Sequence, residues 1–347
     1  MSARARTPTL TRSDIQQGWT GKVGMDTERV HFTARPAVSV VVPVYNSQDV
    51  LPDLANRLGL ALSNAAPAFE LVLVNDGSRD RSWDVIAHLA TIHPWLRGIN
   101  LTRNYGQHNA LLCGVRAARY EVVVTMDDDL QHPPEEVPRL LAKLAEGHDV
   151  VYGTPQEEQH SRWRGLASRV TKLALQSAMG TETARKVSAF RAFRSRVREA
   201  FAAYSGPFVS IDVLLTWGTT RFAATPVRHD PRRFGASHYT LRKLVTHALN
   251  MMTGFSTLPL QFASLVGFAF TLFGVGVLVY VVGRYMVQGT SVAGFPFLAS
   301  VIAIFSGAQL FALGIIGEYL ARMHFRMMER PTYTVHSTTP ALAQLSP

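Results

Sequence analysis

The sequence predicts an α/β protein with a Rossmann-like, mixed but mainly parallel sheet, joined to a hairpin of two membrane-spanning helices. Between residues 38 and 152, short aliphatic and β-branched runs alternate with segments of helical periodicity, which is typical of a parallel sheet covered by helices. Further along, 258–282 and 295–316 contain 25 and 22 residues without a charge. At 1.5 Å per residue, each could cross a hydrocarbon core of about 30 Å.

The elements follow in order along the globular part. Strands are expected at 38–42, 69–74, 96–101, 122–126 and 149–152. Helices are expected between them at 49–62, 83–90 and 110–118, and from the Pro133-Pro134 pair through 137–144. The strands are nearly all apolar, as strands buried on both faces are.

Beyond residue 153 the alternation stops, and two helical patterns precede the first apolar stretch. The pattern at 161–179 has a basic and an apolar face, so it could lie on a membrane surface or pack equally well on its own domain. The pattern at 241–255 runs directly into the first span and is better placed to be interfacial.

These features divide the chain into five predicted parts. They are a disordered polar leader (1–36), a globular domain (37–235), a juxtamembrane interfacial helix (236–256), two transmembrane helices within 257–320 (about 258–282 and 295–317), and a tail (321–347). The leader has no apolar core of a signal peptide. Basic residues flank the outer ends of the spans, whereas the connection 283–294 carries only Arg284. We therefore expect a multi-pass protein of the cell (inner) membrane, with the globular domain and both termini in the cytoplasm.

Composition narrows the partners. The formal net charge is +10, but no nucleic-acid-binding motif occurs. Much of the excess positive charge lies beside the predicted spans, where anionic lipid headgroups attract Lys and Arg. We therefore expect a membrane surface and no nucleic acid. The single cysteine, Cys113, lies in an apolar run and is interpreted as a buried hydrophobe, not a nucleophile.

Three polar clusters follow predicted strands, at 43–46, 75–78 and 127–131. The carboxyl ends of parallel strands meet at one edge of a sheet, where ligands bind, so the clusters should converge. Asp76 is placed to accept hydrogen bonds from a base or ribose, although it could also belong to a plain Asn-Asp-Gly turn.

The acidic run Asp127-Asp128-Asp129 carries the strongest chemical signal. Three adjacent carboxylates repel one another, and a divalent cation would relieve the repulsion. In an extended segment Asp127 and Asp129 share a face with Gln131, while Asp128 points away. Oxygen ligands suit Mg²⁺ or Mn²⁺ bridging to phosphate. The alternative is a solvated acidic turn that caps the next helix.

Several motifs occur in a fixed order. They are Val-Val-Pro-Val-Tyr-Asn (41–46), Val-Asn-Asp-Gly-Ser (74–78), Leu-Thr-Arg-Asn-Tyr-Gly (101–106) and Met-Asp-Asp-Asp-Leu-Gln (126–131), followed by 189–191, 233–239, 255–260 and 314–322. Together they resemble family 2 glycosyltransferases of GT-A fold. Within that family they resemble the polyprenyl-phosphate group that includes bactoprenol glucosyltransferases, undecaprenyl-phosphate formamido-arabinose transferases and dolichol-phosphate mannose synthase.

The resemblance implies transfer of a monosaccharide from a nucleotide-diphosphate sugar, with UDP favoured, to undecaprenyl or another polyprenyl phosphate. An ionised lipid phosphate can attack the anomeric carbon directly, without a catalytic base, so a single displacement with inversion is expected. A homotetramer is also implied. The implied nucleotide contacts are Pro43, Tyr45, Asn46, Asp76 and Asp128, and the implied metal ligands are Asp127, Asp129 and Gln131. The resemblance also implies that Arg191 contacts phosphate and takes part in catalysis together with Asp127 and Asp129. The residues implied to bind the lipid phosphate are Arg232, Arg233, Ser237, His238 and Tyr239.

Three positions depart from the family pattern. Ser47 replaces a usual Glu, His238 replaces a frequent Lys, and Gln156 stands where an arginine is expected, with Arg162 or Arg164 as candidate substitutes. Three other functions stay open: a non-catalytic nucleotide- or lipid-binding module, a transferase acting on another lipid, and a processive polysaccharide synthase. The last is suggested by Gln-His-Ser-Arg-Trp at 159–163, but two spans are few for a channel.

Overall fold

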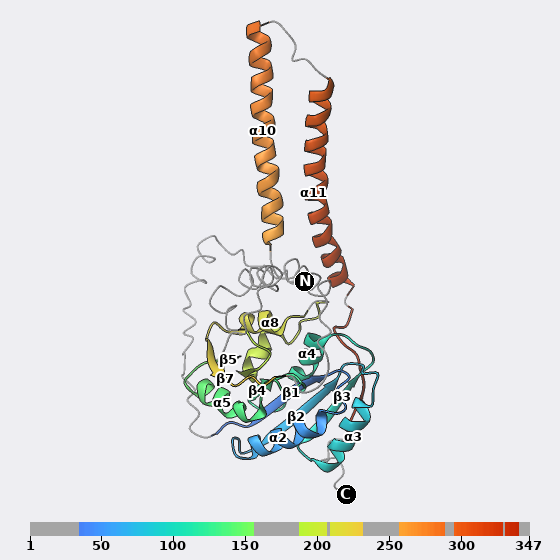
Figure 1. Cartoon of the computed structure of the whole chain (residues 1–347), viewed down its shortest axis with the longest axis vertical. Helices are drawn as coiled ribbons and strands as arrows, with labels where there is room; N and C mark the ends of the chain where they lie inside the picture. The colour runs from blue at the N-terminus through green and yellow to red at the C-terminus, as the bar shows by residue number, and fades with distance from the viewer. Residues whose placement is uncertain are drawn as a thin grey trace, which may run out of the picture. The chain divides into compact units, whose positions relative to one another are not determined.

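The computed structural model describes residues 35–155, 187–206, 209–231, 257–288, 295–328 and 330–339. These residues form an eight-stranded sheet with the strand order β7-β5-β6-β4-β1-β2-β3-β8 (Figure 1). The strands are β1 Val38–Val44, β2 Phe69–Asn75, β3 Leu96–Leu101, β4 Val122–Thr125, β5 Val150–Pro155, β6 Arg191–Arg194, β7 Phe222–Val227 and β8 Val335–Thr338.

The sheet is mixed and mainly parallel, which confirms the prediction. β1 is parallel to both β2 and β4, β2 is parallel to β3, and β5 is parallel to β7. β6 inserts antiparallel between β4 and β5, and β8 adds antiparallel to β3. The five predicted strands correspond to β1–β5, whereas β6, β7 and β8 were not predicted. β6 (RAFR) and β8 (VHST) lack the continuous apolar run that identifies the equally short β4 (VVVT).

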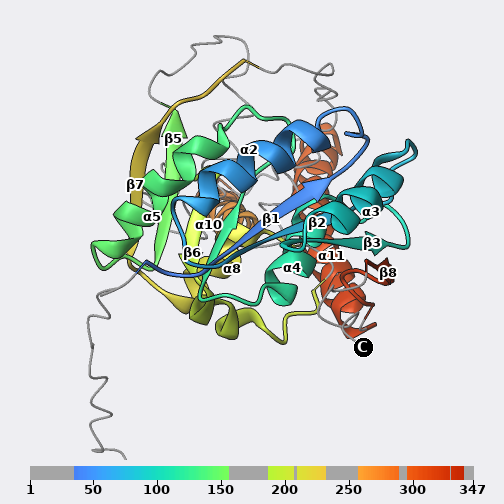
Figure 2. The same ribbon diagram turned by 90° about the horizontal axis from the view of Figure 1, so that it is seen from below.

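Helices cover both faces of the sheet (Figure 2). They are α2 Leu51–Ser63, α3 Ser82–Ile92, α4 Gln107–Ala117, η1 Pro134–Glu136, α5 Val137–Ala145, η3 Ser195–Phe201 and α8 Ile211–Gly218. Alternate residues of β1 point to opposite faces, as a two-residue repeat requires. Val38 and Val42 join a core with α2, α3 and α5, whereas Val41 joins a core with α4, η3 and α8.

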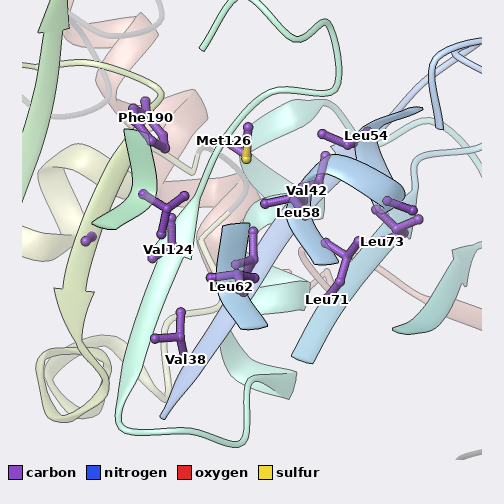
Figure 3. Packing of buried hydrophobic residues seen from close by; sticks show 14 of the residues in the cluster. Val38, Val42, Leu54, Leu58, Leu62, Leu71, Leu73, Val124, Met126 and Phe190 are labelled. Carbon is purple, nitrogen blue, oxygen red and sulfur yellow. The ribbon is translucent and has the colours of Figure 1, made fainter. Parts of the chain in front are cut away.

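The first of these cores shows why α2 forms where it does. Leu54, Leu58 and Leu62 recur at helical spacing, and all three are fully buried. They lie over Val42 and Leu71 of the neighbouring strands (Figure 3). Cys113 lies in the opposite core, and burial raises the pKa of its thiol to about 12. The interpretation of Cys113 as a buried hydrophobe is confirmed.

Two long helices, α10 Leu258–Gln288 and α11 Phe295–Met327, follow the globular elements. Windows within Leu258–Val287 and Ile304–His324 are long and apolar enough to cross a membrane, and none of either window is buried. Phe305 of α11 contacts Phe270 and Phe273 of α10 with ring centroids 5.7 and 6.3 Å apart. The helices have 31 and 33 residues, so at about 47 and 50 Å they extend beyond the predicted spans and beyond a hydrocarbon core.

The segment after α11 returns to the sheet. β8 pairs with β3, and the amide of Gly98 donates to the Thr339 hydroxyl at 2.8 Å, while the Thr339 amide donates to the Gly98 carbonyl at 3.0 Å. Part of the predicted tail 321–347 is therefore a strand of the globular domain. The predicted leader, but for its last two residues, and the helical patterns at 161–179 and 241–255 lie outside the described residues.

Candidate active site

The strand order brings the predicted polar clusters to one edge of the sheet. β4, β1 and β2 are parallel neighbours, with Val41 opposite Thr125 and Val44 opposite Asn75. The amide of Asp76 continues the ladder by donating to the Val44 carbonyl at 2.9 Å. The residues that follow these strands therefore share the carboxyl edge, where ligands bind in such sheets.

The loop after β1 is hydrogen-bonded to the acidic run. Asp128 accepts from the Tyr45 amide at 3.3 Å and from the Ser47 hydroxyl at 2.5 Å through one carboxylate oxygen. Burial raises the pKa of Asp128, and the Ser47 hydrogen bond partly opposes this. Ser47 therefore supplies a donor at a position where a Glu would repel Asp128.

Asn46 connects the same loop to the turn after β2. Its backbone is in the left-handed region, with φ of 55°, which Asn tolerates better than most residues. Its amide donates to the Ser78 hydroxyl at 3.0 Å, and its side-chain oxygen accepts from the Arg79 amide at 2.8 Å. Two of the three predicted clusters are thus joined directly.

Asp127 and Asp129 have different partners from Asp128. The carboxamide of Gln107, the first residue of α4, donates to Asp127 at 2.5 Å, and the Gln131 amide donates to Asp129 at 3.1 Å. In the described part of the chain, no three His, Cys, Asp or Glu side chains gather as a metal cluster. Two carboxylates nevertheless fit Mg²⁺ or Mn²⁺, because such ions take their other ligands from water and substrate phosphates.

Asp76 is 2% exposed and holds the loop between β3 and α4. Its two carboxylate oxygens accept from the amides of Tyr105 and Gly106 at 2.7 and 2.8 Å. Burial raises its pKa against the opposing effect of these bonds. Gly77 has φ of 63°, and a Cβ there would lie 2.5 Å from the backbone of Arg103 and Asn104, so only glycine fits this close approach.

Arg191 is placed differently from an exposed phosphate ligand. It lies on β6 opposite Thr125, it is 1% exposed, and its guanidinium forms a buried ion pair with Asp212 of α8. Its Nε donates to the Thr125 hydroxyl at 3.0 Å, and the hydroxyl of Tyr152 donates to Asp212 at 3.1 Å. Asp212 was not singled out from the sequence; an Asp in the first turn of an otherwise apolar helix was the available signal.

A pair of histidines adjoins the acidic run and was also missed. The His132 ring stacks on Phe190 at 5.3 Å and lies 5.0 Å from the His229 ring. Burial lowers the pKa of His132 to about 4, so it is neutral at physiological pH. The candidate lipid-phosphate residues Arg232, Arg233, Ser237, His238 and Tyr239, together with Gln156, Arg162 and Arg164, lie outside the described residues.

Known proteins match most of this chain. Residues 39–201 match the family model of glycosyl transferase family 2. The chain is 36% identical over 313 residues to undecaprenyl-phosphate 4-deoxy-4-formamido-L-arabinose transferase of Pseudomonas aeruginosa (strain LESB58), covering 89% of this chain and 92% of that protein. The protein of the same name from Yersinia pestis (strain Pestoides F) is 35% identical over 307 residues, covering 88% and 94%.

Similar folds occur among solved structures. One is glucosyl-3-phosphoglycerate synthase from Mycobacterium tuberculosis in complex with Mn²⁺, uridine diphosphate and phosphoglyceric acid. It is 18% identical with a TM-score of 0.46, and the match covers 72% of this chain and 82% of that one.

Proposed function

Because this chain belongs to glycosyl transferase family 2 and is a glycosyltransferase, we propose that it transfers one sugar from a UDP-sugar to undecaprenyl phosphate with inversion. One observation carries the proposal: the similarity to sugar transferases named for undecaprenyl phosphate spans 89% of a chain that also has two helices long and apolar enough to cross a membrane. A lipid acceptor lies in a membrane, where the two apolar helices would hold the enzyme close to it. A water-soluble acceptor would not require these helices.

The proposed chemistry is a single displacement. An oxygen of the lipid phosphate, already ionised at neutral pH, forms a bond to the anomeric carbon while the bond from that carbon to the diphosphate breaks. No side chain has to remove a proton. The site must align the two reactants and stabilise the negative charge that builds up on the leaving diphosphate.

We assign Asp127, Asp129 and Gln131 to a site for Mg²⁺ or Mn²⁺, and the diphosphate of the donor would bind to this site through the cation. A bound divalent cation would neutralise charge on the leaving group. The hydrogen bonds from Gln107 to Asp127 and from the Gln131 amide to Asp129 support this assignment, because they orient both carboxylates in advance.

We assign the nucleoside to the loops after β1 and β2. Tyr45 is 44% exposed although its amide is fixed by Asp128, so its ring is available for stacking on a base. Pro43 and Asn46 shape that loop. The carboxylate oxygens of Asp76 each retain a lone pair after binding the loop amides, so a ribose hydroxyl could still donate to them.

We assign the acceptor phosphate to the basic residues that precede α10, namely Arg232 and Arg233 with Ser237, His238 and Tyr239. Arg191, on β6, would contribute indirectly by fixing β6 to β4 and α8. A multi-pass position in the cell membrane, with the catalytic domain cytoplasmic, follows from the charge asymmetry of the sequence. The homotetramer stays a prediction, which the mass of the detergent-solubilised protein would test.

The test is transfer of label from a panel of sugar nucleotides to undecaprenyl phosphate in detergent with Mg²⁺ or Mn²⁺. We expect one donor to give a single lipid-linked sugar, and Asp129→Asn to lower the rate by roughly 100-fold or more. Asp84→Asn, which removes an exposed carboxylate on α3, is the matched control and should leave the rate unchanged. A polymeric product, or nucleotide binding without transfer from any donor, would contradict the proposal.

A further inference from the structure

The strand that follows the membrane helices is anchored beside the candidate active site. β8 pairs with β3 with a register shift between Asn100 and Leu101, at the end of β3 that leads into the loop 102–106 (Figure 2). Tyr333, just before β8, packs on the core around α4, and the guanidinium of Arg116 lies 5.9 Å from its ring. The chain leaving α11 is therefore fixed to the sheet at both ends of β8.

The same segment contacts the loop between β3 and α4. The Thr102 amide donates to the Thr334 carbonyl at 3.0 Å. The Tyr105 hydroxyl lies 2.9 Å from the Thr102 hydroxyl, and the side chains of Thr102 and, to a lesser degree, Thr334 lower the pKa of Tyr105. The guanidinium of Arg103 lies over the Tyr105 ring at 4.6 Å. Thr334 thus holds the loop through its backbone carbonyl, and its side chain is near enough to influence the Tyr105 hydroxyl.

The other side of this loop faces the carboxylates of the site. The Tyr105 and Gly106 amides donate to Asp76, and the next residue, Gln107, donates to Asp127. One short segment is therefore bonded to the C-terminal strand on one side and to two candidate site carboxylates on the other.

We propose that β8 and its preceding residue Thr334 position the donor site, with Tyr105 and Gln107 as the positioning residues that carry this support to Asp76 and Asp127. The inference rests on the proposed function in taking Asp76 and Asp127 as donor-binding groups. Because the loop is tied at both sides by hydrogen bonds, loosening it from Thr334 frees the amides that hold Asp76. The chain beyond the membrane anchor is thereby a structural part of the site.

The test uses the full chain in detergent with Thr334→Val and Tyr105→Phe, which remove hydroxyls while keeping shape and backbone. Thr338→Val is the matched control: it makes the same change at an exposed position of the same strand, opposite Ile99 and away from the loop. Amide hydrogen exchange over 101–110 reports loop positioning without any substrate. The KM values for donor and for undecaprenyl phosphate report its consequence.

We expect faster exchange over 101–110 in Thr334→Val and Tyr105→Phe, and none of this change in Thr338→Val. Loss of one hydrogen bond should raise the donor KM by about 3- to 10-fold with an unchanged acceptor KM. The double variant should be no worse than Tyr105→Phe alone, since that substitution already removes the interaction of the Tyr105 hydroxyl with Thr334.

Unchanged exchange in both test variants, or an equal change in Thr338→Val, would overturn the inference. A rise in the acceptor KM alone would do so as well. Failure of the wild-type protein to transfer any sugar would count against the proposed function, and the exchange result would still decide whether Thr334 positions the loop.

Discussion

Near the acidic run, buried charged side chains are paired with partners from distant segments of the chain. Arg191 and Asp212 are both buried, and each supplies the opposite charge that the other needs away from water. The motif in which Arg191 occurs predicts contact with phosphate, but the structure gives the guanidinium a carboxylate and a threonine hydroxyl as partners. The guanidinium therefore links β6 to β4 and to α8.

Removing one member of this pair should harm stability more than removing both. Asp212→Asn leaves Arg191 as a buried charge without a carboxylate, and a broken buried pair costs about 3–5 kcal/mol. Arg191→Met combined with Asp212→Asn leaves no buried charge and should recover part of that loss. Thermal unfolding of both variants in detergent measures the difference. A double variant that melts below Asp212→Asn would contradict the buried-pair interpretation.

Strands are tied together by a second buried carboxylate, far from the carboxyl edge. Glu70 of β2 accepts from Ser39 of β1 at 2.6 Å, from Arg97 of β3 at 2.8 Å and from the Arg119 amide after α4 at 2.7 Å. Burial alone would raise the pKa of Glu70, but these hydrogen bonds lower it below its usual value of 4.5. Three elements of the central sheet are thus joined at one side chain.

Glu70 should make stability depend on pH in a defined direction. Because its folded pKa is lowered, its contribution is present above the unfolded pKa of about 4.5 and is lost as pH falls through the folded pKa. Glu70→Gln should cost roughly 1–3 kcal/mol at pH 7. The difference from wild type should shrink at acidic pH, where the wild-type carboxyl is protonated. Melting temperatures of both proteins across this range provide the measurement, and a constant difference would argue against the assignment.

Across the whole molecule, the two apolar helices lie between segments that belong to the same sheet. β7 precedes α10 and β8 follows α11, and both are strands of one sheet. A sheet cannot be divided by a bilayer, so helices that span a membrane between these strands must do so an even number of times. The hairpin predicted from the distribution of Arg and Lys satisfies this requirement with two crossings.

Cysteine labelling in intact cells would test this topology. Cys113 is buried and its pKa is about 12, so it supplies little background at neutral pH. Ser291→Cys, in the connection between the spans, should react with a membrane-impermeant maleimide. Thr338→Cys, on β8, should react only after the membrane is permeabilised. Labelling of both positions from outside would refute the hairpin.

Short windows of sequence were sufficient for β1–β5, for the helices between them and for the acidic run. Continuous apolar runs and helical periodicity are local properties, because burial imposes a residue type at neighbouring positions. The mixed sheet was part of that prediction, but its antiparallel strands were not located. A strand such as β8 (VHST) has no apolar run or regular alternation of its own and is specified by pairing with its neighbour.

The tertiary structure decided which side chains meet. Gly98 and Thr339 are 241 positions apart, and no local pattern relates them. Gln107 could not be assigned to Asp127, nor Asp212 to Arg191, until the folded chain brought the start of α4 to Asp127 and α8 to Arg191. Such partners are determined by the close packing of the folded chain, which brings distant segments into contact. The residue types along one segment depend only on its own burial and secondary structure.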